Sequence, residues 1–187
     1  MLRKIASMFG RKKDPLDAYR IDHLAGRTVD AAVFPQKDLL VGEGLYAYRL
    51  TFMVSNENAG RVRSAIATQF VIPSDDRFFV IELTNSLGYS IHGAVRPEFN
   101  GAVVEMLTNC VDLLHSLDGL QLQPLAPWLA FPDFEPEGVG SLQGNIEFWW
   151  WHFWAPFWRS LPEERRQRYL RESPPEWAEF IDTHPTG

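Results

Sequence analysis

Hydrophobic residues alternate with polar ones along much of the first half of the chain. In residues 45–54 the alternate positions are Tyr46, Tyr48, Leu50, Phe52 and Val54. A period of two places such side chains on one face of a β-strand. The same alternation recurs in residues 62–72, 78–84 and 89–95, and turn-forming residues separate the stretches. Because short connections favour antiparallel neighbours, this pattern predicts an antiparallel β-meander.

The hydrophobic period then lengthens to that of an α-helix in residues 100–118. The apolar positions are three and four residues apart and are Val103, Val104, Leu107, Val111, Leu114 and Leu117. Gly119 follows, in a position that commonly closes a helix. We expect this amphipathic helix to cover one face of the sheet. Residues 121–125 and 31–34 are candidates for a further short strand, and residues 15–25 have the apolar spacing of a short helix.

Prolines and aromatic residues dominate the last third of the chain. Residues 124–136 hold four prolines, which exclude a regular helix and predict an extended surface segment. Residues 148–158 predict a helix that Pro156 bends or breaks. Ser-x-Pro-Glu sequences at 160–163 and 173–176 predict the starts of two more helices. The fold class is therefore α+β: an antiparallel β-meander of four to five strands covered by an amphipathic helix, with a Pro- and aromatic-rich helical C-terminal part.

The composition is that of an ordinary globular domain, with 187 residues, 45% hydrophobic and 22% charged. Residues 1–14 carry five basic side chains and one acidic one, so we expect a basic, flexible tail before a single domain of residues 15–187. No apolar run approaches the ~20 residues that a membrane-spanning helix needs. The lack of a secretory signal and the single cysteine, Cys110, predict a cytoplasmic protein.

The net charge of −6 hides an uneven distribution along the chain. Residues 97–158 contain eight acidic side chains and no Lys or Arg. A field of one sign repels nucleic acid and attracts basic proteins or cations. We therefore expect a basic protein partner and no nucleic acid. The alternative is an acidic face that only keeps the protein soluble.

The densest aromatic cluster is in residues 148–158, where eight of the eleven side chains are aromatic. A helix that is apolar on every side is either buried in the core or presents one side to a partner. Aromatic side chains are frequent anchors of protein interfaces, and a homodimer face fits the same pattern. The acidic and aromatic features together predict these partner-binding residues: Asp112, Asp118, Trp128, Phe131, Asp133, Phe134, Glu135, Glu137, Glu147, Trp149, Trp150 and Trp154.

Signatures of catalysis and of metal binding are weak. Residues 42–47 match the dinucleotide-binding pattern G-x-G-x-x-A, but a strand follows where that motif needs a helix. Cys110 and His115 lie about 140° apart on the predicted helix, so they do not form a local nucleophile–base pair. Glu135 and Glu137 alone are too few ligands to predict a cation site. We predict no catalytic residue, no metal and no cofactor, and an enzymatic function is uncertain.

Two hypotheses about function follow. The first is a cytoplasmic protein-binding module that engages a basic partner through an acidic, aromatic-rich surface. In size, acidity, α+β pattern and lack of catalytic motifs the chain resembles bacterial immunity proteins, which neutralise a cognate toxin that is often a basic enzyme; an effector chaperone or adaptor has the same character. The alternative is a small enzyme or ligand-binding protein with a pocket between the sheet and the aromatic cluster. Its functional residues would be His92, His152, Cys110 or the loop that carries Glu135 and Glu137.

Overall fold

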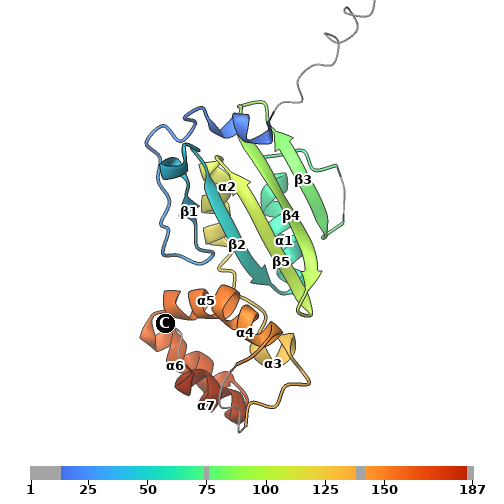
Figure 1. Cartoon of the computed structure of the whole chain (residues 1–187), viewed down its shortest axis with the longest axis vertical. Helices are drawn as coiled ribbons and strands as arrows, with labels where there is room; N and C mark the ends of the chain where they lie inside the picture. The colour runs from blue at the N-terminus through green and yellow to red at the C-terminus, as the bar shows by residue number, and fades with distance from the viewer. Residues whose placement is uncertain (1–13, 74–75, 138–141, 185–187) are drawn as a thin grey trace, which may run out of the picture.

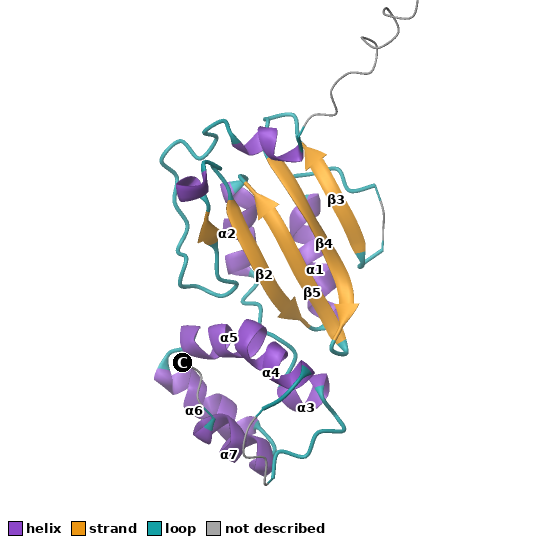
Figure 2. Cartoon of the chain, viewed as in Figure 1, coloured by secondary structure: helices purple, strands orange, loops and turns teal. Residues whose placement is uncertain are grey.

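Five antiparallel strands form the sheet of this fold. The computed structural model describes residues 14–73, 76–137 and 142–184, and Figures 1 and 2 show its elements. The strands are β1 (Asp38–Leu39), β2 (Tyr48–Val54), β3 (Phe79–Thr84), β4 (Ser90–Glu98) and β5 (Gly101–Thr108). Within the described residues their order is β1-β2-β5-β4-β3, and every neighbouring pair is antiparallel. The predicted α+β class and its antiparallel sheet are confirmed.

Hairpin turns connect β3 to β4 and β4 to β5. β2 also pairs with β5, but the connection from β2 to β3 crosses over to the far edge of the sheet. Phe99 and Asn100 form the β4–β5 turn, and both have a positive φ (50° and 59°). A two-residue turn of this kind matches the right-handed twist of the two strands that it joins. The chain leaves β2 and passes through α1 (Asn56–Ala67) to reach β3 at the far edge of the sheet. The sheet is thus a three-strand meander that β2 and β1 extend.

Residues 62–67 of the segment predicted as the second strand belong to helix α1, which begins at Asn56, and residues 68–72 form no strand. Ser55 caps its N-terminus by accepting a hydrogen bond from a backbone amide of the first turn (3.2 Å). Val62 and Ile66 fit an alternating pattern and also the i, i+4 spacing of a helix, and Ala59 extends the helical spacing by three residues. All three side chains are buried. The prediction of a strand in residues 62–72 was wrong because those apolar positions suit both periods and the cap decides between them.

The helix predicted over residues 100–118 is divided between β5 and α2 (Val111–Gly119). β5 lies in the middle of the sheet, and its first four residues, Gly101 to Val104, are all buried. Such a strand is apolar at consecutive positions, which resembles helical spacing. The described residues 31–34 and 121–125 contain no strand, and the fifth strand is β1. The helix expected in residues 15–25 is only the short 3₁₀ helix η1 (Pro15–Tyr19); a second 3₁₀ turn is η2 (Val41–Glu43).

Helices α1 and α2 cover one face of the sheet, behind it in the view of Figure 1. The core between them and the sheet contains Leu50, Phe52, Ile91, Val104, Leu113 and Leu117, all with almost no exposed area. The opposite face of the sheet carries exposed polar side chains such as Arg49 and Thr51. Arg96 and Glu105 form an ion pair across two strands of this face (2.7 Å). The sheet therefore has one apolar and one polar face, as is usual for antiparallel sheets.

The C-terminal part of the chain is helical, as predicted. The expectation that prolines exclude a helix from residues 124–136 was wrong, because Pro127 begins a short helix there, in the first turn, where a helix tolerates proline. Its elements are α3 (Pro127–Ala130), α4 (Asn145–Trp149), η3 (Trp150–Trp154), α5 (Ala155–Ser160), α6 (Glu163–Glu172) and α7 (Pro175–Thr183). α4, η3 and α5 follow one another without a break, and η3 is a π-helical turn. This turn lies just before Pro156, which is in the first turn of α5. Because proline has no amide hydrogen, it interrupts the regular helical hydrogen bonds at this point. The N-cap position of α6 is Pro162 and not Ser160. The Ser160 hydroxyl instead donates to the Phe157 carbonyl oxygen (2.6 Å).

Aromatic contacts attach this helical part to one end of the sheet. Trp149 Nε1 lies 2.8 Å from the sulfur of Met53 on β2. The Phe99 ring, in the β4–β5 turn, lies 6.4 Å and 6.0 Å from the rings of Phe148 and Phe153. One buried cluster contains side chains of both parts. None of the described helices has the length and apolar character needed to cross a membrane.

Candidate functional site

The tryptophan-rich helix forms the core of the helical part. Trp149, Trp150 and Trp154 have no exposed area. The rings of Trp149 and Trp154 are stacked with centroids 5.8 Å apart, and the Trp150 ring lies 5.5 Å from that of Phe180 on α7. The Trp154 ring lies 5.3 Å from Tyr169 on α6. The expectation that these tryptophans reach a partner at the surface was wrong, because neighbouring helices and the sheet enclose them.

The end of the Pro-rich segment, around Phe134 to Pro136, lies alongside α7 in an extended conformation. Phe134 is half-buried and Pro136 is buried, whereas Glu135 and Glu137, which alternate with them, are exposed. This is the period of two that an extended backbone produces. The Phe134 ring lies 5.7 Å from the ring of Trp177 on α7. Aromatic contacts therefore hold the segment against α7 while its carboxylates point to solvent.

Helix α7 supplies a second acidic wall. Pro175 occupies the first turn of the helix, and Glu176 follows it, where a carboxylate interacts favourably with the helix dipole. Glu176 and Glu179 are exposed and three residues apart, so they lie on one face of the helix. Trp177 is buried against the Pro-rich segment. The walls of the site come from two segments that are some forty residues apart in the sequence.

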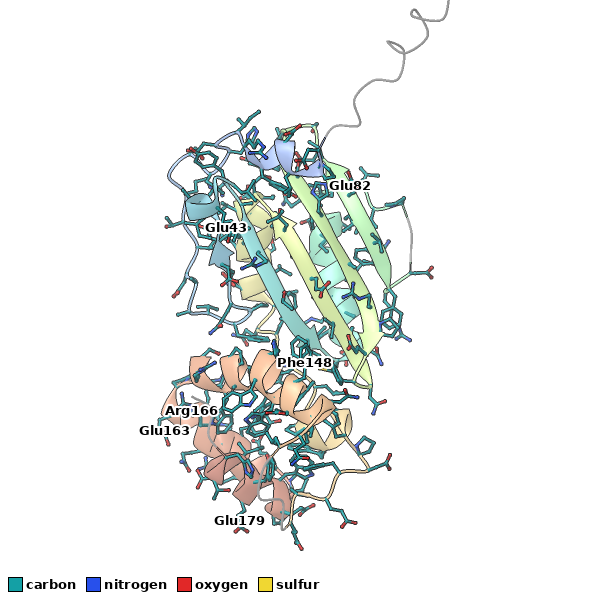
Figure 3. The ribbon with its side chains drawn as sticks, viewed as in Figure 1. Glu43, Glu82, Phe148, Glu163, Arg166 and Glu179 are labelled. Atoms are coloured by element: carbon teal, nitrogen blue, oxygen red, sulfur yellow. The ribbon has the colours of Figure 1, made fainter. Side chains whose placement is uncertain are left out.

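Two adjoining cavities lie between these walls. The larger has a volume of about 560 Å³ and is lined by Trp128, Pro132, Phe134, Glu135, Pro136, Glu137, Glu176 and Trp177. The smaller has a volume of about 260 Å³ and is lined by Pro136, Glu137, Glu176, Glu179, Phe180, Thr183 and His184. Because they share three residues, we treat them as one site, the acidic groove. Figure 3 shows Glu179 at the end of the molecule that is far from the sheet.

The electrostatics of the acidic groove are one-sided. Its described lining contains four carboxylates and no Lys or Arg. Within the described parts of the chain, none of Glu135, Glu137, Glu176 and Glu179 forms an ion pair. Carboxylates attract a cation by charge, and an aromatic ring attracts it through the negative potential of its face. The arrangement is suited to the side chain of Arg or Lys.

The structure brings four of the twelve predicted partner-binding residues together in the acidic groove. These four are Trp128, Phe134, Glu135 and Glu137. Asp133 and Glu147 are exposed but line neither cavity. Phe131 is half-buried, and its ring packs against Trp149 at 5.5 Å.

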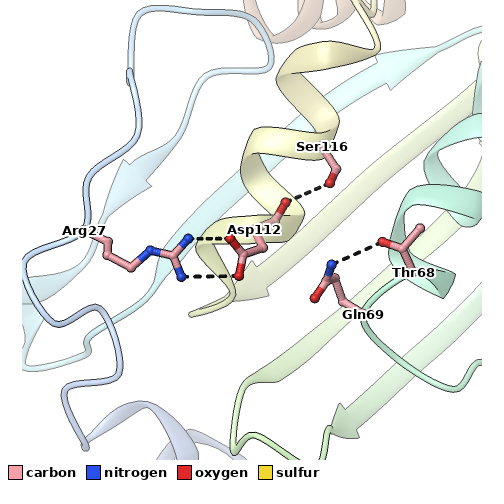
Figure 4. Close-up of polar contacts among 5 residues, drawn as sticks. All are labelled: Arg27, Thr68, Gln69, Asp112 and Ser116. Carbon is pink, nitrogen blue, oxygen red and sulfur yellow. Dashed lines mark hydrogen bonds and ion pairs between the residues drawn. The ribbon is translucent and has the colours of Figure 1, made fainter.

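Asp112 and Asp118, also predicted to bind a partner, form ion pairs within the fold. The Arg27 guanidinium donates to both carboxylate oxygens of Asp112, which lowers the pKa of that carboxyl group (Figure 4). Asp118 Oδ1 lies 2.6 Å from Nζ of Lys37, whose side chain has no exposed area. The same ammonium group donates to three backbone carbonyl oxygens of the preceding loop (2.9, 3.2 and 3.4 Å). Both carboxylates lie outside the acidic groove.

Sequence reasoning missed two parts of the surface. The prediction of a last helix did not include its outer face, although Glu176 and Glu179, three residues apart beside a buried Trp177, signal an acidic surface there. Sequence reasoning also chose the wrong side of the tryptophan-rich helix. The aromatic residues that reach the surface there are Phe148 and Trp151, with 47% and 39% of their surface exposed.

The residues named for the enzymatic alternative have structural contacts. His92 Nδ1 lies 2.5 Å from the Tyr19 hydroxyl of η1, and His92 Nε2 lies 3.5 Å from a carboxylate oxygen of Glu82. Burial raises the pKa of the Tyr19 hydroxyl far above its ordinary value, and it also raises the pKa of the Cys110 thiol. In the described part of the chain, no group of three or more His, Cys, Asp or Glu is placed to hold a metal ion.

Known proteins offer no comparison for this site. No protein-family model, curated protein or solved structure matches the chain. A functional assignment therefore depends on the geometry and charge of the site itself, and the acidic groove is where four of the predicted residues come together.

Proposed function

We propose that the chain is a protein-binding module whose acidic groove engages a basic segment of a partner protein. The observation that supports it is the lining of the groove: aromatic side chains beside four carboxylates, with no Lys or Arg among the described lining residues. The most specific form of the proposal is a cytoplasmic bacterial immunity protein that neutralises a basic toxin. An effector chaperone or adaptor is the broader form.

The groove would recognise cationic side chains by two effects that act together. The aromatic faces of Trp128 and Phe134 attract a guanidinium or ammonium group, and they also pack against the methylene stem of an Arg or Lys side chain. The carboxylates of Glu135, Glu137 and Glu176 offer charge-assisted hydrogen bonds. A neutral or acidic segment gains neither contribution, so charge determines the choice of partner.

The partner should also contact surface beyond the groove. A stable protein interface buries about 800 Å² on each side, which is more than one groove supplies, so the groove is expected to be the central anchor point. Leu129, next to Trp128 in the short helix α3, has 53% of its surface exposed and extends the apolar area. Association should be fast and should slow with salt, because exposed charges are screened within about 10 Å at 0.1 M ionic strength.

Affinity capture from the native lysate tests the proposal with three immobilised proteins. The first is the unchanged chain. The second carries Glu135→Lys, Glu137→Lys and Glu176→Lys in the groove. The third carries Glu43→Lys, Glu57→Lys and Glu98→Lys, which are exposed carboxylates elsewhere and match the charge change. Figure 3 shows Glu43 in the sheet part, away from the groove.

The expected result is that the unchanged chain and the control variant retain the same basic protein, whereas the groove variant does not. Circular dichroism of each protein verifies that the substitutions leave the fold intact. Retention of no protein at either low or high salt would sink the proposal. Equal retention by the groove variant would also contradict it.

Growth rescue separates the immunity form from the chaperone or adaptor form. The chain is co-expressed with a toxin encoded beside its own gene, and cell growth is followed. An immunity protein restores growth, and the groove variant fails to do so. Capture of a basic partner without protection of growth favours a chaperone or an adaptor.

A further inference from the structure

Another cavity lies where the helical part meets the sheet part of the molecule. It has a volume of about 560 Å³, and its lining includes Phe34, Gln121, Gln123, Arg165, Arg168 and Tyr169. We call it the seam cavity. Its walls are the loop before β1, the end of α2 with the residues that follow, and helices α5 and α6 (Figure 1). A concave site of this size between packed parts is typical of small-molecule sites.

One wall of the seam cavity presents two available guanidinium groups. Arg165, Arg168 and Glu172 are spaced by three and four residues on α6, so they share the face that lines the cavity. The Arg165 guanidinium has no hydrogen bond or ion pair within the described residues. Arg168 has only an exposed contact with Glu164 (3.6 Å), which is worth little in water.

The neighbouring Arg166 shows what an engaged arginine looks like on the same helix. Its Nε donates to the Trp158 carbonyl oxygen and its terminal nitrogen to that of Arg159, both at 3.0 Å. Figure 3 labels Arg166 on α6. The helix therefore engages Arg166 in its own contacts, whereas Arg165 and Arg168 lie on the wall of the seam cavity.

The remaining walls supply neutral hydrogen-bonding groups. The side-chain amides of Gln121 and Gln123 form no hydrogen bond with the described residues. Burial raises the pKa of the Tyr169 hydroxyl far above its ordinary value, so the phenol stays neutral and is able to donate. The charge of the Asp118 carboxylate is balanced by the buried Lys37, and its Oδ1 has no hydrogen-bond partner among the described residues, so it is able to accept one from a ligand without adding net charge.

We infer that the seam cavity binds a small molecule that carries one oxyanion, either a carboxylate or a phosphate. The guanidinium groups of Arg165 and Arg168 hold the oxyanion, because guanidinium matches both anions with paired hydrogen bonds. Asp30 and Glu172 disfavour a second negative charge on the ligand. The apolar body of the ligand packs on the Phe34 side of the cavity. This site is separate from the acidic groove and does not depend on its function.

Titration with model compounds tests this inference. The probes are benzoate and phenyl phosphate, with benzamide as the neutral control of similar shape. Binding is followed through the side-chain Nε–Hε NMR signals of the arginines, in the unchanged chain and in Arg165→Gln and Arg168→Gln. Arg171→Gln is the matched control, because Arg171 is on α6 and exposed but does not line the cavity.

We expect benzoate or phenyl phosphate to move the signals of Arg165 and Arg168 and to leave that of Arg171 in place. Each of the two cavity substitutions should weaken binding about tenfold, the usual cost of losing a charge-assisted hydrogen bond. The stronger of the two probes identifies the oxyanion. Binding of neither anion, equal binding of benzamide, or equal weakening by Arg171→Gln would overturn the inference. The variant with three lysines in the acidic groove should bind the probe as tightly as the unchanged chain does. Failure of the seam-cavity inference is therefore distinguishable from failure of the acidic-groove proposal.

Discussion

The buried ion pair between Lys37 and Asp118 yields a quantitative prediction about stability. Lys37 belongs to the loop before β1, and Asp118 belongs to α2. The Lys37 side chain has no exposed area, and 22% of the Asp118 side chain is exposed. Replacing Lys37 with Met keeps the apolar stem but removes the charge. Asp118 then loses its ion-pair partner, and three backbone carbonyl oxygens lose their donor.

The expected loss in the free energy of unfolding is about 3 kcal/mol. Removing one partner of a buried ion pair costs about 3–5 kcal/mol, because the other charge stays buried without compensation. The partial exposure of Asp118 lets water reach its carboxylate, which favours the lower end of that range. In a chain of this size, the loss corresponds to a fall in melting temperature of roughly 6–12 °C.

Urea unfolding followed by tryptophan fluorescence measures this difference. The matched control is the double variant Lys37→Met with Asp118→Leu, which removes both charges and leaves none unpaired. We expect the double variant to recover most of the lost stability, since apolar replacement of a whole buried pair is often neutral. If Lys37→Met is within about 0.5 kcal/mol of the unchanged chain, the size of an ordinary surface substitution, the reasoning is refuted. The same holds if the double variant is no more stable than the single one.

Two further predictions concern titratable groups. Arg27 lowers the pKa of Asp112 in the folded chain, so this pair stabilises the fold above the ordinary carboxyl pKa of about 4 and its contribution is lost as the pH falls through the lower, folded value. Asp112→Asn should therefore flatten the acid side of a stability–pH curve, and an unchanged acid side would contradict this. Cys110 is fully buried, and burial raises the pKa of its thiol. A thiol reagent, followed by absorbance, should therefore react with Cys110 only after unfolding in urea. Fast reaction of the native chain would contradict this prediction.

Much of the fold was predictable because local patterns agree with the tertiary structure. β3 and β4 have clear alternation between turn sequences, and α7 has both a proline start and helical spacing. α1 and β5 were not predictable from periodicity alone. The apolar residues of α1 fit two periods. The middle strand β5 has consecutive buried apolar residues, Ala102, Val103 and Val104, and this run resembles helical spacing.

The site was predictable only in part, for a different reason. Proline spacing and charge marked Glu135 and Glu137 as exposed carboxylates on an extended segment. Which residues lie opposite them depends on how α7 packs against that segment, and Glu176 is far away in the sequence. Likewise, an all-apolar helix does not indicate which side faces water, so Trp149 was chosen where Trp151 is exposed.

The most direct test of the central claim is the dissociation constant of the captured basic partner for three proteins, measured at low salt. We expect the variant with lysines at Glu43, Glu57 and Glu98 to bind nearly as tightly as the unchanged chain. The variant with lysines at Glu135, Glu137 and Glu176 should bind at least about thirtyfold more weakly, because breaking desolvated charge pairs costs about 2 kcal/mol or more. Both variants have the same net charge, so only the position of the change differs. Equal weakening in the two variants would contradict a specific role of the acidic groove.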